Sequence, residues 1–226
     1  MSDAPSDILV FGAGFGTRMA PLTETLPKPL VSVGGKPLID HAIAHGRKRG
    51  LSIHVNGHYR AEQLAEHLAD DIAFHHESPD ILDTGGGLKS ALREMSGQAV
   101  FTLNSDAVWA GPNPLDVLAN SWTPDMAALL LLVPRLNTVG YSRPGNFSCV
   151  DGGKLERDPD GDIYTGAQII GRSFVSATEG TAFSLNKVWD ALMADGRAYG
   201  VLYPGHWADV GTPEAIPLAE AMLQDV

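Results

Sequence analysis

The feature that most limits how this chain can fold is a run of glycines and prolines at residues 11–29, FGAGFGTRMAPLTETLPKP, directly after the short apolar segment 8–10. Proline has no backbone N–H and its ring clashes in a helix interior, so the three prolines prevent a regular helix from starting at Thr17 and continuing. The sequence therefore predicts a strand followed by a long irregular loop.

The composition of this loop favours phosphate binding. Glycines allow backbone N–H groups to approach an anion closely, and Arg18 and Lys28 add positive charge. The spacing Gly12, Gly14, Gly16 is not the G-x-G-x-x-G of a dinucleotide loop, and the Gly-Lys-Ser/Thr of a P-loop is absent from the sequence. A glycine-rich surface turn is the alternative, but it leaves the two basic residues unexplained.

The overall composition indicates one globular domain. The chain has 226 residues, of which 44% are apolar, and we expect a single domain over residues 1–226, as a monomer or small homo-oligomer. No stretch reaches the roughly 18–20 apolar residues of a membrane span, and the polar, acidic N-terminus resembles neither a signal nor a transit peptide. The single cysteine, Cys149, excludes an internal disulfide. These features predict a cytoplasmic protein without a membrane partner.

The charge is negative and unevenly distributed. A net charge of −11 argues against a nucleic-acid partner. Residues 1–50, however, hold six Lys and Arg against four Asp and Glu, so the rest of the chain carries the excess of negative charge. An acidic body repels a nucleoside triphosphate unless a divalent cation intervenes.

Strand-like and helix-like segments alternate, which predicts an α/β fold: a Rossmann-like three-layer sandwich around a mostly parallel sheet. Residues 138–171 break this pattern with turns at 151–153 and 158–162, and we expect hairpins there, in a small antiparallel insertion that forms one wall of a pocket. The expected strands are residues 8–10, 53–55, 72–74, 100–103, 127–133 and 199–203, and the expected helices are residues 37–49, 61–69, 88–95, 186–194 and 213–223.

Two aspartates follow predicted strands. Asp106 comes after strand 100–103, and Asp209 comes after strand 199–203. Because ligands bind beyond the carboxyl ends of strands in open α/β sheets, we expect both side chains at the site. Two carboxylates suit Mg²⁺, which prefers oxygen ligands and keeps substrate phosphate oxygens and waters around it. A turn or helix cap is the alternative for either aspartate alone.

A second glycine run, DTGGG at residues 83–87, precedes the predicted helix 88–95. Backbone N–H groups at a helix N-terminus can donate to an acceptor, although a tight loop required by packing is the alternative. The adjacent His75 and His76 do not predict a zinc site, because neighbouring side chains on a strand point in opposite directions. His206, beside Trp207, is expected to help shape the site.

Residues 11–29 resemble the opening of the sugar-1-phosphate nucleotidyltransferases, L-A-A-G-x-G-T-R-x-x-P-L-T-x-x-x-P-K-P. Further matches extend the resemblance to Gly211, including W-x-D-V-G-T from Trp207. Two positions differ from the pattern in ways that bear on the site. Gly12 stands where alanine is usual and is expected to loosen the loop near the nucleobase, and Ser105 replaces a glycine and is expected to narrow the space beside the metal.

The resemblance implies the nucleotide-diphospho-sugar transferase fold and a Mg²⁺-dependent reaction of a nucleoside triphosphate (NTP) with a sugar 1-phosphate, giving an NDP-sugar and pyrophosphate. It implies a catalytic role for Arg18, Lys28 and Asp106, and Mg²⁺ ligation by Asp106 and Asp209. The implied nucleotide-binding residues are Gly12, Ala13, Gly14, Gly16, Thr17, Arg18, Asn56, Asp83, Thr84, Gly85 and Gly86. The implied sugar-phosphate-binding residues are Lys28, Asn146, Gly166 and Asn186.

Within this family, the sequence is most similar to the uridylyltransferases of N-acetylmuramate 1-phosphate. The resemblance rests on D-T-G-G-G at residues 83–87, G-N-F at residues 145–147 and G-H-W-x-D-V-G-T at residues 205–212. It implies UTP and N-acetylmuramate 1-phosphate as substrates, in cell-wall sugar recycling. A mannose-1-phosphate guanylyltransferase is the alternative enzyme, and a catalytically silent nucleotide-sugar-binding subunit is the non-enzyme alternative.

Overall fold

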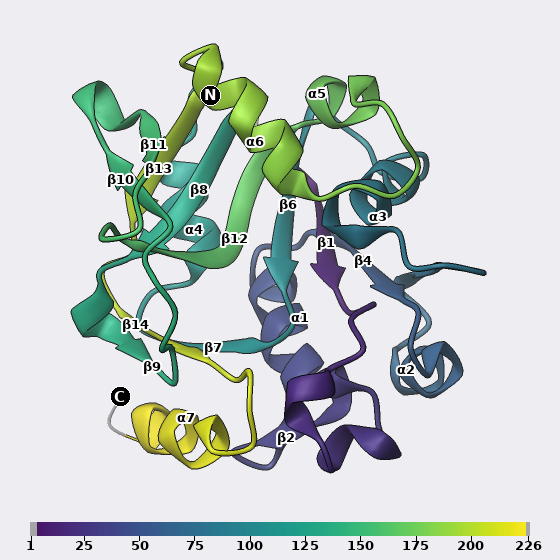
Figure 1. The fold of residues 1–226 in the computed structure, drawn as a ribbon. Coiled ribbons are helices and arrows are strands. Elements are labelled where there is room, and N and C mark those ends of the chain that lie inside the picture. Colours follow the sequence, from purple (N-terminus) through teal and green to yellow (C-terminus); the bar gives the residue numbers. More distant parts are fainter. Residues whose placement is uncertain (1–3, 225–226) are drawn as a thin grey trace.

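The computed structural model describes residues 4–224, so residues 1–3 of the polar N-terminus lie outside it. A seven-stranded sheet with the order β13-β8-β12-β6-β1-β4-β5 forms its centre (Figure 1). In this sheet β12 runs antiparallel to both neighbours, and the other paired strands are parallel. The strands are β1 (Asp7–Phe11), β4 (Ser52–Gly57), β5 (Ala73–His76), β6 (Ala99–Asn104), β8 (Ala128–Val133), β12 (Ile163–Gly171) and β13 (Ala198–Leu202).

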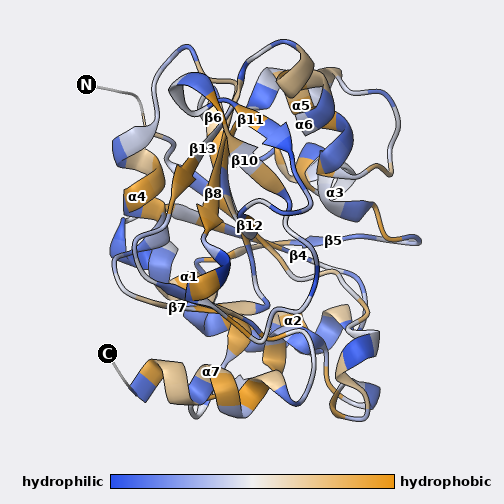
Figure 2. Ribbon diagram, turned by 60° about the vertical axis from the view of Figure 1, so that its left-hand side comes forward, coloured by the Kyte–Doolittle hydropathy of each residue, from blue (hydrophilic) through white to orange (hydrophobic). Residues whose placement is uncertain are grey.

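Helices cover both faces of this sheet, which confirms the predicted three-layer α/β fold (Figure 1). One face is covered by α1 (Leu38–Lys48), α2 (Ala61–His67) and α4 (Pro114–Ser121), and the other by α3 (Asp83–Ala91), α5 (Arg172–Ala177) and α6 (Leu185–Ala194). The sequence of β8, ALLLLV, is apolar and buried throughout. Side chains on both faces of the sheet must therefore be shielded from water by helices. Figure 2 shows this apolar centre between the helical layers. Among the described residues, no helix is both long and apolar enough to cross a bilayer.

A smaller three-stranded sheet lies beside the carboxyl ends of the central strands. It has the order β7-β14-β9, with β7 (Ala107–Ala110), β14 (His206–Asp209) and β9 (Thr138–Val139). The C-terminal helix α7 (Ala215–Gln224) and the hairpin of β2 (Ser32–Val33) and β3 (Lys36–Pro37) pack against it. In Figure 1 these elements form the lower part of the molecule. This sheet positions the two aspartates described below.

The predicted start of the third helix was wrong. The helix α3 begins at Asp83 rather than at residue 88, so the glycine run forms its first turns. Glycine is a poor helix former, and the sequence therefore favoured a loop. Packing explains the glycines instead, since a Cβ added to Gly86 would lie 2.1 Å from the carbonyl oxygen of Thr181.

The segment 138–171 forms one predicted hairpin and part of the main sheet. The strands β10 (Phe147–Cys149) and β11 (Leu155–Arg157) pair across the turn at Asp151–Gly153, as predicted. The turn at 158–162 leads from β11 into β12, and β12 pairs with β6 and β8 instead of β11. The second hairpin prediction was therefore wrong, because β12 is buried between β6 and β8 in the central sheet.

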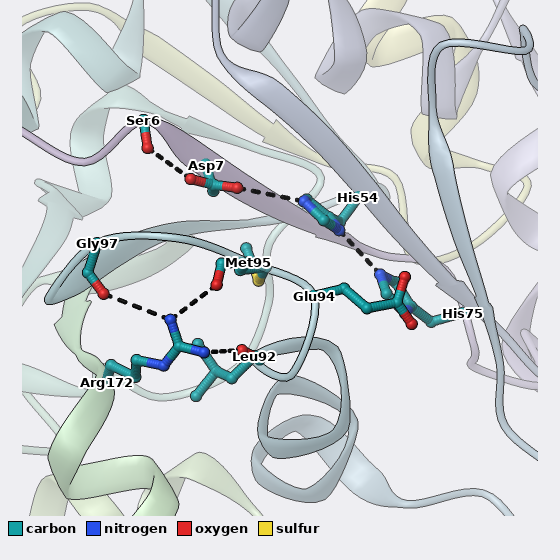
Figure 3. Close-up of polar contacts among 9 residues, drawn as sticks. All are labelled: Ser6, Asp7, His54, His75, Leu92, Glu94, Met95, Gly97 and Arg172. Carbon is teal, nitrogen blue, oxygen red and sulfur yellow. Dashed lines mark hydrogen bonds and ion pairs between the residues drawn. The ribbon is translucent and has the colours of Figure 1, made fainter.

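A row of polar side chains links β1, β4 and β5, away from the glycine loop; Figure 3 shows these side chains. His54 on β4 contacts Asp7 on β1 at 3.3 Å and His75 on β5 at 2.9 Å, and His75 lies 3.7 Å from Glu94 after α3. In the same region Arg172 donates to the carbonyl oxygens of Leu92, Met95 and Gly97 (Figure 3). The contact between Asp7 and His54 pairs two buried polar side chains that would otherwise cost stability.

Candidate active site

The glycine loop is irregular, as the prolines predicted. It contains three separate 3-10 turns, at Thr17–Met19, Leu22–Glu24 and Lys28–Leu30. Gly16 adopts a left-handed φ of 64°, and its carbonyl accepts hydrogen bonds from the Met19 amide and the Thr23 hydroxyl. The loop therefore has a defined shape, with Arg18 exposed on its surface.

Gly12 is closely packed against the neighbouring backbone, so the expectation that it loosens the loop was wrong. Its N–H donates to Asn56 Oδ1 at 2.9 Å, and an added Cβ would lie 2.8 Å from the Asn56 carbonyl oxygen. Glycine is required here by close backbone packing. Ser105 is likewise engaged locally, because its hydroxyl donates to the carbonyl of Phe11 at 2.6 Å. It ties the end of β6 to β1.

The two aspartates meet through the pairing of β7 with β14. Asp106 directly precedes β7, Asp209 is the last residue of β14, and Asp209 lies opposite Ala107 in the antiparallel register. The Val210 amide also donates to the Asp106 carbonyl at 2.9 Å. The sequence placed Asp209 directly after strand 199–203, but the intervening strand β14 turns the chain back and brings its side chain to Asp106.

Each carboxylate is paired with a cation. Lys28 Nζ donates to Asp106 Oδ2 at 2.7 Å, and Arg143 Nη2 donates to Asp209 Oδ2 at 2.8 Å. Arg18 is close to Asp209 as well, because a Cβ at Gly211 would lie 3.1 Å from Arg18 Nη1 and 3.2 Å from Asp209 Oδ1. The sequence singled out Lys28 and Arg18 but missed Arg143, which lies in no recognisable motif.

The charges of the site act on both acids. Burial raises the pKa of Asp209, and the neighbouring Asp106 carboxylate raises it further, against the opposing effect of Arg143, Lys28 and Arg18. Burial also acts to raise the pKa of Asp106, but Lys28 outweighs it, and the net shift of that pKa is downward. Two carboxylates this close need neighbouring positive charge, which a bound divalent cation also supplies.

A pocket of about 260 Å³ opens beside this charged centre. Glu77 forms part of its wall and is 3% exposed. Its carboxylate accepts hydrogen bonds from the side-chain amide of Asn56 at 2.6 Å and from the Leu82 N–H at 2.7 Å. The lining residues are Phe11, Gly12, Ala13, Gly14, Lys28, Pro29, Asn56, Glu77, Ile81, Asp83, Thr84, Asn104, Ser105 and Asp106. Sequence reasoning missed Glu77, which follows the short strand β5 within a polar stretch.

The second glycine run contributes its first two residues to this pocket. Asp83 and Thr84 line it, whereas the N–H groups of Gly85 and Gly86 both donate to the Phe183 carbonyl, at 2.8 and 3.0 Å. These two amides are therefore engaged within the fold. The contacts of Gly85 and Gly86 agree with the alternative explanation of this glycine run, that packing requires glycine there.

Of the residues expected on the sugar side, Asn146 and Gly166 lie in the insertion and Asn186 lies on α6. Asn146 Oδ1 accepts from the Tyr164 N–H at 2.8 Å, and Asn186 Oδ1 accepts from Arg157 at 2.7 Å. Gly166 has a φ of 84° and packs against Asn104, since an added Cβ would lie 2.6 Å from its Cγ. Asn104 lines the pocket, so Gly166 lies next to a pocket residue. The side chains of Asn146 and Asn186 are instead engaged in local hydrogen bonds. His206 is exposed at the start of β14.

The donor set fits Mg²⁺ held jointly by protein and substrate. Within the part of the chain that the structure describes, no group of three or more His, Cys, Asp or Glu side chains could hold a metal ion alone. Mg²⁺ is usually bound by one or two carboxylates together with waters and substrate phosphates. Asp106 and Asp209 supply that number of carboxylates, next to a loop suited to phosphate.

The glycine loop, the two aspartates and the pocket meet at the carboxyl edge of an α/β sheet, which suits the binding of a nucleotide and its phosphates. The chain belongs to the MobA-like NTP transferase domain family, whose model matches residues 8–144. This confirms the family resemblance seen in the sequence.

Individual proteins agree with this assignment. The chain is 36% identical to the N-acetylmuramate alpha-1-phosphate uridylyltransferase of Caulobacter vibrioides, over 100% of both chains. It is 30% identical to the mannose-1-phosphate guanyltransferase of Gibberella zeae, over 91% of this chain and 61% of that protein. A putative glucose-1-phosphate thymidylyltransferase from Bacillus anthracis, solved in complex with sucrose, shares the fold with a TM-score of 0.81 at 16% identity, over 97% of this chain and 96% of that chain.

Proposed function

We propose that this protein transfers a nucleotidyl group from an NTP to a sugar 1-phosphate, in a Mg²⁺-dependent reaction that releases pyrophosphate. The observation that carries the proposal is the pairing of Asp106 with Lys28 and of Asp209 with Arg143 beside the glycine loop. Such a centre suits a reaction between two anions, which needs neutralisation of charge more than it needs a base.

The side chains have distinct roles in this reaction. A phosphate oxygen of the sugar 1-phosphate attacks the α-phosphorus, and pyrophosphate leaves in line. Arg18 and the loop N–H groups hold the β- and γ-phosphates, and Lys28 contacts the α-phosphate or the sugar phosphate. Asp106 and Asp209 hold Mg²⁺, which when bound neutralises charge on the reacting phosphates. Because the nucleophile is already anionic, no side chain needs to remove a proton.

The pocket lined by Asn56, Glu77, Asp83 and Thr84 is the proposed nucleobase site. We propose UTP and N-acetylmuramate 1-phosphate as substrates, because the relative matched along its whole length is named for that sugar phosphate. The product then belongs to cell-wall sugar recycling in the cytoplasm. A mannose-1-phosphate guanylyltransferase activity is the second candidate, supported by the fungal relative.

The test is pyrophosphate release from the purified protein with Mg²⁺. UTP, dTTP, GTP, CTP and ATP are each combined with N-acetylmuramate 1-phosphate, N-acetylglucosamine 1-phosphate, glucose 1-phosphate and mannose 1-phosphate. Turnover confined to UTP and N-acetylmuramate 1-phosphate supports the full proposal, and turnover with another pair replaces the substrates. Nucleotide binding without turnover of any pair supports the binding-subunit alternative.

A further inference from the structure

The guanidinium of Arg143 lies at the site with donors to spare. It forms an ion pair of 2.8 Å with Asp209, whose side chain is 7% exposed, while the side chain of Arg143 is 55% exposed. A guanidinium carries five N–H donors. Among the described residues, this guanidinium makes a single hydrogen bond, to Asp209. The exposed side chain therefore leaves other donors of the guanidinium available to a ligand.

The ring of Tyr141 packs against this guanidinium, and the ring of Trp207, tilted by 56° to that of Tyr141, lies behind it. Its carbon lies 4.8 Å from the ring centre of Tyr141, and the Tyr141 ring lies 5.8 Å from that of Trp207. Trp207 is two residues before Asp209 on β14. Two nitrogens of Arg135 also donate to the Arg143 carbonyl, each at 3.1 Å. Both the backbone and the side chain of Arg143 thus have partners that favour this position beside Asp209.

The position of Arg143 differs from that of Arg18. Arg143 donates to Oδ2 of Asp209, whereas Arg18 Nη1 and Asp209 Oδ1 both lie within 3.2 Å of the position that a Cβ at Gly211 would take. Arg18 comes from the glycine loop, and Arg143 comes from the loop between β9 and β10, at the start of the insertion. Arg143 therefore contacts the Asp209 carboxylate directly, and Arg18 lies near the same carboxylate from a different element. If the NTP and the sugar 1-phosphate meet beside Asp209, each of these anionic substrates would have an arginine near it.

We propose that Arg143 binds the phosphate group of the sugar 1-phosphate. This inference rests on the proposed nucleotidyl transfer. In the free protein Arg143 neutralises Asp209, and when a divalent cation takes over that charge, the anionic oxygens of the incoming phosphate become the best partners for the guanidinium. Its planar donor pairs match phosphate oxygens in a bidentate geometry. Arg143 is then a substrate-binding residue that sequence motifs do not reveal.

The first test compares Arg143→Gln, Arg143→Lys and the wild type in steady-state kinetics. Arg143→Gln should raise the KM for the sugar 1-phosphate about 10- to 100-fold, the loss typical of one or two charged hydrogen bonds, with the KM for the NTP nearly unchanged. Arg143→Lys should recover part of this loss, since it keeps the charge but not the planar donor pair. Arg47→Gln is the matched control, because Arg47 forms an exposed ion pair with Asp71 away from the pocket.

The second test measures binding without turnover. Calorimetry with Mg²⁺ and α,β-methylene-UTP, which cannot release pyrophosphate, gives the Kd of N-acetylmuramate 1-phosphate and of N-acetylglucosamine 1-phosphate. Weaker binding of both to Arg143→Gln, at unchanged melting temperature and unchanged analogue affinity, supports the proposal. Weaker binding of N-acetylmuramate 1-phosphate alone would assign Arg143 to the sugar carboxylate and overturn it.

An unchanged KM and Kd for the sugar phosphate in an active Arg143→Gln protein would also overturn the inference, while the proposed reaction would stand. A wild-type protein without turnover on any substrate pair would instead remove the proposed reaction, and the role of Arg143 with it. The two failures are therefore distinguishable.

Discussion

Lys28 and Asp106 are 78 positions apart in sequence, and the Lys28 ammonium donates a hydrogen bond of 2.7 Å to the Asp106 carboxylate. The Asp106 carboxylate is partly exposed, and its partner is almost buried, with side-chain exposures of 31% and 12%. This contact joins the glycine loop to the end of β6. It places a cation and a carboxylate where the reacting phosphates are proposed to meet.

Removing either member of this pair should reduce turnover while the fold remains. We expect Lys28→Ala and Asp106→Asn each to lower kcat by about 100-fold or more, because each removes charge aimed at the reacting phosphates. Stopped assays of pyrophosphate release measure this, and circular dichroism checks the fold. Asp116→Asn, at an exposed aspartate paired with Arg49, is the control. Near-normal kcat for Asp106→Asn would contradict the role given to Asp106.

Changing Glu77 should weaken binding of the NTP more than binding of the sugar 1-phosphate. Glu77→Gln replaces one carboxylate oxygen with a donor that opposes either the Asn56 amide or the Leu82 N–H. We expect a loss of about 1–3 kcal/mol in stability, the usual result of an unpaired buried group, and a KM for the NTP raised about tenfold. Urea unfolding and initial rates measure the two effects. A KM raised equally for both substrates would argue against a nucleobase site at Glu77.

The glycines of α3 should be intolerant of a methyl group. Gly86→Ala would place Cβ 2.1 Å from the Thr181 carbonyl oxygen, so the backbone must shift, and we expect a loss of about 1–3 kcal/mol. Gly14→Ala is the control for stability, because a Cβ there would meet no heavy atom within 4 Å. Chemical denaturation compares the two variants. Equal stability of both would contradict the packing explanation.

Acid should destabilise the fold through two histidines. The pKa of His45 is lowered to about 4, chiefly by burial. The pKa of His75 is lowered by burial and by the neighbouring His54, which Figure 3 shows beside it. The folded protein then binds fewer protons than the unfolded chain below the usual histidine pKa of about 6.5. Stability should therefore fall as the pH drops from 6.5, and for His45 this fall continues to about pH 4.

Unfolding midpoints in urea between pH 7.5 and 4 measure this dependence. We expect it to be shallower in His45→Gln and in His75→Gln, because each variant removes one group that the unfolded chain protonates more readily. His206→Gln is the control, since His206 is exposed. A pH dependence equal to that of the wild type in both buried-site variants would show that these histidines do not contribute.

The parts of the site that were predictable from sequence are local. The prolines and glycines of residues 11–29 specify an irregular loop in any context, and Asp106 directly follows an apolar strand. The alternation of strands and helices was likewise sufficient for the three-layer fold, because it depends on local hydrophobic periodicity.

The rest depends on contacts between distant residues. Asp209 reaches Asp106 through the four-residue strand β14, whose pairing with β7 is not encoded in either segment alone. The start of α3 is stabilised by Phe183, which overrides the low helix propensity of the glycines. Arg143 approaches Asp209 from 66 positions away and belongs to no periodic pattern. Tertiary packing determines all three features.

The measurement that tests the central claim most directly is the rate of pyrophosphate release from UTP and N-acetylmuramate 1-phosphate, with Mg²⁺ and after chelation of divalent cations by EDTA. The account predicts turnover with Mg²⁺, loss of turnover with EDTA, and recovery when excess Mg²⁺ is restored. Turnover that persists at full rate after chelation would contradict the metal role of Asp106 and Asp209. No turnover with any sugar 1-phosphate in the presence of Mg²⁺ would contradict the proposed reaction itself.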